Sequence, residues 1–394
     1  MISTGPSVMH LARFVNGYPF KPDQLGEDGF PVIRIRQLLD DCAEPERAQP
    51  PPDAVFINSG DLILSWSATL AVRLWERGPG LLNQHLYRVD TGPVVDKRWF
   101  RYVLEVGVAR LTPLMHGSAM THITQDMLRV LTIAVPCLPT QHAIADYLDA
   151  ETARIDALIE KKQRMVELLE ERCWSVTSSL AEATPERAPL RRYIIDACDG
   201  PFGSALKSEH YVEGGARVIR LGNIGRANWK DDDTAYISVP YWRTLARHQA
   251  RKGDLVIAGL GDDGNPVGRA AVVPAIEPAM VKADCYRLRI DACLADVRFL
   301  AWYLSSPEGL AQSEQRSEGS TRPRLTLSKA LALRVPWLPL NEQQLLADRV
   351  ENEVARLGHT KASLQCQVRL LQEHRQALIT GAVTGQPEIP GIAA

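Results

Sequence analysis

The 394-residue sequence has no long apolar run, no CxxC pair and no strong charge of either sign. No stretch approaches the roughly 20 apolar residues of a membrane-spanning helix, and Met1 is not followed by the basic and apolar regions of a signal peptide. The 7 cysteines are scattered and lack zinc-ligand spacing. We therefore expect a cytoplasmic protein with reduced thiols, no metal site and no membrane partner.

The formal net charge is only -2. Lys+Arg against Asp+Glu count 13 against 14 in residues 1–138, 5 against 9 in 139–182, 22 against 18 in 183–338 and 5 against 6 in 339–394. A nucleic-acid binder with this distribution would depend on local basic patches or on a basic partner, because its overall field is weak.

Motifs of common catalytic classes are also missing. There is no Walker-type phosphate loop, no amino-methyltransferase tetrapeptide, no metal-dependent nuclease pattern and no ligand spacing among the histidines. One glycine-rich segment, Gly259 to Gly264, spells GxGxxG. Asp262 and Asp263 would repel a pyrophosphate, and the following Ala270–Val273 has a strand pattern where a dinucleotide loop needs a helix. We expect a glycine-rich hairpin there and no catalytic residue in the chain.

An internal repeat is the main positive feature. Five motifs recur in the same order about 200 positions later, which indicates a duplication. They are Pro31–Ile35 with Arg217–Leu221, Gly60–Leu64 with Gly253–Ile257, Asp96–Phe100 with Asp296–Leu300, Gly117-Ser118 with Gly319-Ser320, and Val135–Pro139 with Val335–Pro339.

Each half begins with short apolar runs separated by Gly, Pro and Asp, which predicts strands and turns. The expected strands are Val32–Ile35, Leu62–Ser65, Leu86–Val89, Val218–Leu221, Leu255–Ala258, Ala270–Val273 and Cys285–Ile290, with a helix over Asp296–Ser305. A long helix then closes each half after the proline-rich junction at Pro139 or Pro339. The fold class is α+β with a pseudo-twofold repeat.

Both closing helices carry a narrow apolar seam at alternating steps of four and three, typical of a coiled coil. The residues predicted to pair the helices are Ile155, Ile159, Val166, Leu169 and Val176 in the first, and Leu357, Leu364, Val368, Leu371 and Leu378 in the second. Lys162, Lys361 and Arg375 are polar members of the seams. We expect antiparallel pairing over about 60 Å. The alternative is that each helix packs only on its own domain.

Polar and cationic residues on loops are the remaining candidates for function. In the second half they are Ser204, Lys207, Arg220, Asn223, Arg322 and Arg324, and in the first half Arg34, Arg36, Gln84 and His85. Guanidinium groups can bind phosphate or the edge of guanine, and Asn can pair with adenine. For each residue alone, a surface ion pair or a turn hydrogen bond is the alternative.

Together these features resemble the specificity (S) subunit of type I restriction-modification systems. The likeness rests on Asn16–Lys21, Asp199–Ser204, Arg220–Ile224, both Gly-Asp-Leu strands and both proline junctions, and it covers almost the whole chain. The first junction departs from the family pattern, because Thr140-Gln141-His142 replaces the Glu-Gln pair seen at Glu342-Gln343. This departure weakens the expected helix cap.

The resemblance implies target-recognition domains over residues 1–139 and 183–339, spacer helices over 140–182 and 340–382, and a tail over 383–394. It implies a non-catalytic subunit that recognises a bipartite double-stranded DNA target. It also implies two methyltransferase (M) subunits and restriction (R) subunits as partners, which would hold S-adenosylmethionine, ATP and Mg. The alternatives are a coiled-coil adaptor between proteins, without DNA specificity, and a self-contained restriction enzyme.

Overall fold

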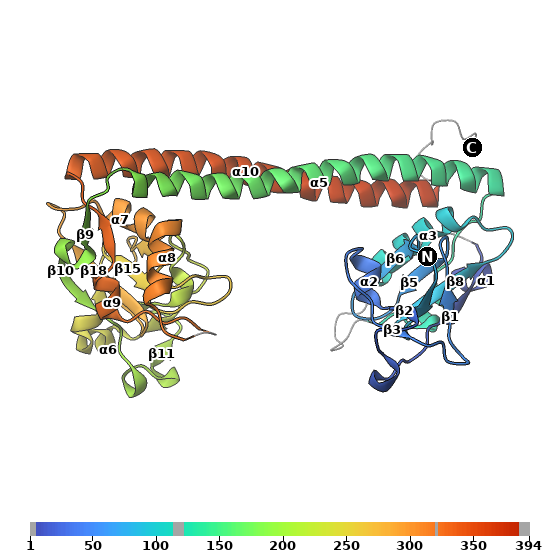
Figure 1. The fold of residues 1–394 in the computed structure, drawn as a ribbon, viewed down its shortest axis with the longest axis horizontal. Helices are drawn as coiled ribbons and strands as arrows, with labels where there is room; N and C mark the ends of the chain where they lie inside the picture. Colours follow the sequence, from blue (N-terminus) through green and yellow to red (C-terminus); the bar gives the residue numbers. More distant parts are fainter. Residues whose placement is uncertain (1–4, 113–121, 320–321, 386–394) are drawn as a thin grey trace. The chain divides into compact units, whose positions relative to one another are not determined.

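The computed structural model describes residues 5–112, 122–319 and 322–385, which divide into two compact units. One unit comprises residues 1–162 and 366–394, and the other comprises 163–365. Each unit contains an α+β domain and part of each of two long helices, α5 (Leu138–Glu182) and α10 (Leu340–Thr384) (Figure 1). These are the helices expected over 140–182 and 340–382.

The domain of the first unit contains two four-stranded sheets, with strand orders β1-β8-β5-β6 and β3-β2-β7-β4. Its elements are α1 (Val8–Leu11), β1 (Ala12–Asn16), η1 (Pro22–Gln24), β2 (Phe30–Ile33), α2 (Ile35–Leu39), β3 (Arg47–Ala48), β4 (Phe56–Ile57), β5 (Leu62–Ser65), β6 (Ala71–Leu74), β7 (Gly80–Leu82), β8 (Leu86–Thr91), α3 (Lys97–Leu111) and α4 (Gln125–Arg129).

The domain of the second unit has sheets ordered β10-β18-β15-β16 and β11-β13-β12-β17-β14, with a short pair β19-β9. Its elements are β9 (Arg187–Pro189), η3 (Leu190–Tyr193), β10 (Ile194–Cys198), η4 (Gly203–Ala205), η5 (Ser208–His210), β11 (Tyr211–Val212), β12 (Ala216–Ile219), η6 (Leu221–Asn223), β13 (Tyr236–Ile237), α6 (Val239–Thr244), η7 (Ala246–His248), β14 (Gln249–Ala250), β15 (Leu255–Ala258), β16 (Ala270–Val272), β17 (Ala279–Val281), β18 (Cys285–Ile290), α7 (Val297–Leu304), α8 (Pro307–Arg316), α9 (Leu327–Leu331) and β19 (Arg334–Pro336).

The duplication read from the sequence is repeated in the strand pairing. In each domain the first sheet is antiparallel, and the second contains one parallel pair, β2 with β7 or β12 with β17. The register is also the same, because Ile33 pairs with Leu82 and Ile219 pairs with Val281. The two domains are therefore copies of one fold. The Gly117-Ser118 copy of the repeat and Ser320 lie outside the described residues.

Most predicted strands are observed, but three end early, one of them β16, which stops at Val272 where Val273 was predicted. β5, β15 and β18 have the predicted bounds, whereas β2 and β12 stop at Ile33 and Ile219. The predictions that extended these strands to Ile35 and Leu221 were wrong, because the chain turns there into α2 and η6. In both turns a side chain three residues after Arg34 or Arg220 accepts a hydrogen bond from that arginine's backbone N–H, which starts a helical turn.

A large apolar core connects each domain to the long helices. In the first unit Trp99 and Phe100 of α3 are fully buried with Leu148 of α5 and Ile379 of α10. In the second unit the corresponding core contains Tyr193 of η3, Phe299 and Leu300 of α7, and Val350 of α10. The apolar faces of the helices are therefore part of each domain's core, and their burial stabilises the packing of helix on domain.

The helix segments inside each unit run antiparallel, as the seam predicted. In the first unit Arg375 Nε lies 2.9 Å from Asp156 Oδ1, and Lys162 Nζ lies 2.6 Å from Gln367 Oε1, so α10 runs backwards as α5 advances. In the second unit Lys361 pairs with Glu170 of α5. All three polar seam residues thus bond to the opposite helix.

All ten residues predicted to pair the helices are buried or half-buried, with Ile155, Leu357 and Leu364 the most covered.

The first helix begins one residue before Pro139, whereas the second begins directly after Pro339. A proline is tolerated in the first turn because its missing N–H would have no partner within the helix.

The segment from Gly259 to Gly264 is a hairpin between β15 and β16, as expected. A Cβ on Gly259 would lie 2.4 Å from the hydroxyl of Tyr286, which is held by a hydrogen bond to the carbonyl of Leu325. We predict that Gly259→Ala destabilises the second domain by about 1–3 kcal/mol through overpacking. Gly264→Ala is the matched control, since its nearest atom would be 3.8 Å away. Equal urea midpoints for the two variants would contradict this prediction.

None of the helices among the described residues combines the length and the apolar composition needed to cross a membrane.

Candidate nucleic-acid interface

Arg34 and Arg220 occupy equivalent places, directly after β2 and β12. Each guanidinium pairs with an acidic side chain about a dozen residues later, Arg34 with Glu46 at 2.9 Å and Arg220 with Asp233. Both arginines remain partly exposed. Because such ion pairs contribute only about 0–1 kcal/mol at a surface, a phosphate or base can replace the carboxylate. Arg36 is exposed on α2, and the corresponding position in η6 is Gly222.

Asn223 does not fit its expected role as a reader of adenine. Its side chain is fully buried, its Oδ1 accepts from the Arg220 N–H, and its Nδ2 donates to the carbonyls of Lys230 and Asp233 at 3.0 and 2.8 Å. Exposing this amide to a base would leave those buried groups without partners. Asn223 therefore supports the turn that carries Arg220, and Gln37 has the same role beside Arg34.

A second site lies at the C-terminal end of β5 in the first domain. Here Trp66 has the imidazole rings of His85 and His122 at 5.6 and 5.7 Å. Its backbone N–H donates to the His85 carbonyl, and its own carbonyl accepts from Ile123. We refer to Trp66, His85 and His122 as the first corner. Gln84 adjoins it, since its carbonyl accepts from Trp66 Nε1 at 3.0 Å and its amide lies 3.4 Å from His85.

The second domain repeats this backbone arrangement with different side chains. The N–H of Gly259 donates to the carbonyl of Asp284, and the carbonyl of Gly259 accepts from Leu325. We refer to Gly259, Asp284 and Arg324 as the second corner. The Arg324 guanidinium pairs with Asp284 at 2.8 Å and lies 5.8 Å from the ring of Phe202. An aromatic and two imidazoles in one copy thus correspond to a carboxylate and a guanidinium in the other.

Each corner lies next to the arginine turn of its own domain. The N–H of Asn83 donates to the Ile33 carbonyl, and that of Lys282 donates to the Ile219 carbonyl. In the second domain buried Arg269 also bonds the carbonyls of Leu221 in the turn and Leu260 beside the corner. The structure therefore brings Arg34, Gln84 and His85 to one end of the first domain's sheets, and Arg220 and Arg324 to the equivalent end of the second.

The other candidates of the second domain lie on loops. Lys207 is exposed, with Glu209 at 3.7 Å, and its backbone N–H starts η5 by donating to His210. Arg322 is exposed two residues before Arg324. Ser204 belongs to η4, but its side chain lies outside the described part of the structure.

Four residues at the corners or beside the arginine turns were not among the candidates predicted from sequence, namely Trp66, His122, Asp284 and Arg269. A signal was present for His122, because the Gly-Ser motifs recur at a spacing of 202 and this spacing pairs His122 with Arg324. The isolated β-bridges show the same equivalence of His122 and Arg324. Ser67 pairs with His122 in the first domain, and Leu260 pairs with Arg324 in the second.

Asp199, at the end of β10, has a perturbed carboxyl group. Burial, reinforced by the nearby charge of Asp284, raises its pKa to about 6, although the backbone N–H groups of Gly200 and Asp284 donate to Oδ1. The raised pKa means that the folded domain favours the protonated form. Its contribution to stability is therefore present below pH 4 and is lost as the pH rises towards 6.

We predict that Asp199→Asn removes this pH dependence. The equivalent residue in the first domain is Asn16, whose Oδ1 accepts from the indole of Trp66. The variant should match the original chain at low pH and exceed its stability by about 1–2 kcal/mol at pH 7.5, after allowance for solvent screening. Urea midpoints at pH 3.5 and 7.5 measure this difference. An identical difference at both pH values would refute the assignment.

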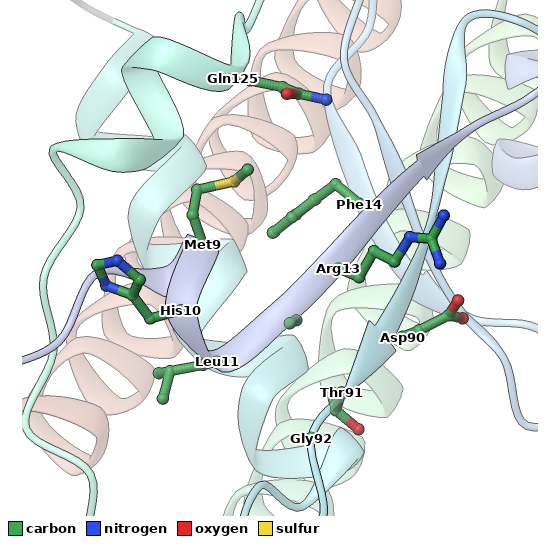
Figure 2. A pocket seen from close by; sticks show the side chains of 10 residues that line it. Met9, His10, Leu11, Arg13, Phe14, Asp90, Thr91, Gly92 and Gln125 are labelled. Carbon is green, nitrogen blue, oxygen red and sulfur yellow. The ribbon is translucent and has the colours of Figure 1, made fainter.

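A separate pocket of about 540 Å³ lies along the edge strand β1, lined by Arg13, Asp90 and Gln125 among others (Figure 2). In the figure the side chains of Arg13 and Asp90 lie near each other, where β1 pairs with β8. The lining includes none of the predicted site residues. Within the described ranges we also find no cluster of three or more His, Cys, Asp or Glu side chains suited to a metal ion.

The described part of the chain thus contains two copies of one α+β domain, each with a polar end and each joined to antiparallel helix segments. A family model for the type I restriction modification DNA specificity domain matches residues 15–168. The EcoBI specificity subunit of Escherichia coli is 21% identical over 96% of this chain and 85% of that protein. The MjaVIII specificity subunit of Methanocaldococcus jannaschii is 19% identical over 76% of this chain and 73% of that protein.

Solved structures have the same fold. A chain from a structural study of complex assembly and conformational transition of the type I restriction-modification system aligns over 96% of this chain and 98% of its own length, with a TM-score of 0.71 and 17% identity. The HsdS subunit of Thermoanaerobacter tengcongensis aligns over 95% and 97%, with a TM-score of 0.50 and 16% identity. The chain is thus similar over most of its length to specificity subunits of type I restriction-modification systems, and residues 15–168 match the DNA specificity domain of that family.

Proposed function

We propose that this chain recognises a bipartite DNA target, with one half-site read by each domain. The observation that carries the proposal is the pair of corners, where one backbone arrangement presents different polar side chains in the two copies. Equivalent backbones would approach the two half-sites in the same way, whereas Trp66, His85 and His122 would select different bases from Asp284 and Arg324. A duplicated chain of this kind can read two unlike half-sites.

The helices would set the separation of the half-sites. Helix length converts into a number of spacer base pairs, because B-DNA and an α-helix both have a fixed rise. The two related halves would also offer similar surfaces to two identical methyltransferase subunits. Restriction subunits would then join this assembly.

The chain itself would contribute sequence choice without catalysis. S-adenosylmethionine, Mg and ATP would be bound by the methyltransferase and restriction subunits. We expect the partners to neutralise most of the DNA phosphates, while this chain selects the bases. The net charge of -2 and the ion pairs already made by Arg34, Arg220 and Arg324 support these separate roles.

Selection from a random duplex library tests the proposal, with and without the methyltransferase partner and over a range of salt concentrations. We expect the complex to enrich a motif of two short half-sites with a spacer of fixed length. No enrichment at any salt would favour a protein adaptor instead. Methylation of DNA by the isolated chain with S-adenosylmethionine would contradict the non-catalytic role.

A further inference from the structure

Gln141 and Gln343 are fully buried polar residues in the first turn of α5 and α10. They are equivalent at the repeat spacing of 202, and both follow a proline-rich junction. A buried amide is costly unless its donors and acceptor are satisfied. Such a residue at the same place in both copies therefore points to a specific arrangement.

Each of these glutamines makes the same three hydrogen bonds. Gln141 Oε1 accepts from the backbone of Asp96 at 2.8 Å, and its Nε2 donates to the carbonyls of Val94 and Pro136 at 3.0 and 2.8 Å. In the second unit Gln343 Oε1 accepts from Asp296 at 3.1 Å, and Nε2 donates to Leu294 and Leu338 at 3.2 and 2.8 Å. One side chain thus joins the long helix, the junction and the segment before α3 or α7.

The bonded residue is also the cap of the domain helix. Asp96 accepts from the N–H of Trp99 at the start of α3, and Asp296 accepts from that of Arg298 at the start of α7. The glutamine therefore fixes the first turn of the long helix against the N-terminus of a domain helix.

A second contact lies further along each long helix. Arg98 of α3 pairs with Asp146 at 2.8 Å and Asp149 at 3.3 Å. Arg298 of α7 pairs with Asp348 at 2.7 Å and Glu351 at 3.0 Å. Two points of attachment separated along a helix define the direction of the helix relative to the domain. Apolar packing alone defines this direction less strictly, because the hydrophobic effect is non-directional.

We propose that Gln141 with Arg98, and Gln343 with Arg298, are positioning residues that hold each domain at a fixed orientation on its long helix. Their function is to make the chain discriminate between DNA spacers of different length. This inference depends on the proposed function, because a fixed orientation matters only if two half-sites are read together. The residues themselves touch no DNA.

The test uses the chain in complex with its methyltransferase partner. Gln343→Met keeps the size of the side chain and removes its hydrogen bonds, and Arg298→Met removes the ion pairs with α10. Arg356→Met is the matched control, since Arg356 pairs only with Glu353 of its own helix among the interactions described. Binding is measured to the selected target and to targets with one base pair more or fewer in the spacer.

We expect Gln343→Met to reduce the preference for the correct spacer about tenfold, the size of effect that loss of a buried hydrogen-bonded group produces. Arg298→Met should reduce this preference less, because its ion pairs with α10 are partly exposed. Base preference within each half-site should not change, and Arg356→Met should behave as the original chain. A uniform loss of affinity for all spacers, or an unchanged preference, would overturn the proposal.

A second readout needs no DNA. Spin labels are attached to cysteines introduced by Lys230→Cys in the domain and Ala355→Cys in α10, two exposed positions of the same unit. With the native exposed cysteines replaced by serine, the distribution of distances between the two labels should broaden when Gln343→Met is added. An unchanged distribution would overturn the proposal even where spacer preference falls. Absence of selective binding by the original chain would instead contradict the proposed function.

Discussion

Inserting one heptad into both α5 and α10, between residues 162 and 163 and between 365 and 366, should lengthen the recognised spacer by about three base pairs. Seven helical residues add about 10.5 Å, and three base pairs of B-DNA span a similar length. A whole heptad keeps the a/d seam in register, so the antiparallel pairing seen at Asp156–Arg375 and Glu170–Lys361 is preserved. Both half-sites should stay the same.

The measurement is selection from a duplex library with spacers of variable length. Three extra base pairs turn the half-sites by about 100° relative to each other, so we expect weaker binding than the original chain shows for its own target. Replacing one heptad by another of equal length is the control and should leave the spacer unchanged. If the inserted variant still selects the original spacer, the helices do not set the separation.

Arg324→Ala should reduce binding of the correct second half-site about 10- to 100-fold, the range for loss of one good bidentate base contact. The side chain is half exposed and held by Asp284, so it can exchange this carboxylate for a base edge without leaving a buried charge. Selectivity at the first half-site should not change, because the first corner belongs to the other unit.

Arg324→Lys separates base reading from charge. Lysine keeps the positive charge but lacks the planar fork of arginine, so binding to unrelated DNA should persist while base preference weakens. Arg243→Ala removes an exposed arginine of α6 and controls for loss of charge. Competition assays against single-base variants of each half-site measure these effects. Loss of preference at both half-sites would contradict independent reading.

The duplication explains why so much of the fold could be predicted. β5, β15 and β18 have their predicted bounds because each apolar run is limited by turn residues and the same pattern occurs twice. The long helices could be predicted because their seams extend over many turns. The repeat spacing of 202 also pairs Gln141 with Gln343, with Thr140 at the place of Glu342.

The site was harder to predict, because burial depends on distant chain segments. Asn223 follows a strand in a polar turn, which suggests exposure, but the carbonyls of Lys230 and Asp233 enclose its amide. The equivalence of Trp66 and Gly259 rests on backbone hydrogen bonds and on no similarity of side chains. Residue type therefore selected Arg34, Arg220 and Arg324 as candidates, whereas only the structure shows the corners that lie beside them.

The most direct test of bipartite recognition is a genome-wide map of methylated bases in cells that contain this chain and its methyltransferase partner. The map is compared with that of cells lacking only this chain. We predict that one split motif, with two different half-sites and a spacer of constant length, disappears with the chain. Methylation at a single contiguous motif, or a map that does not change, would contradict the account.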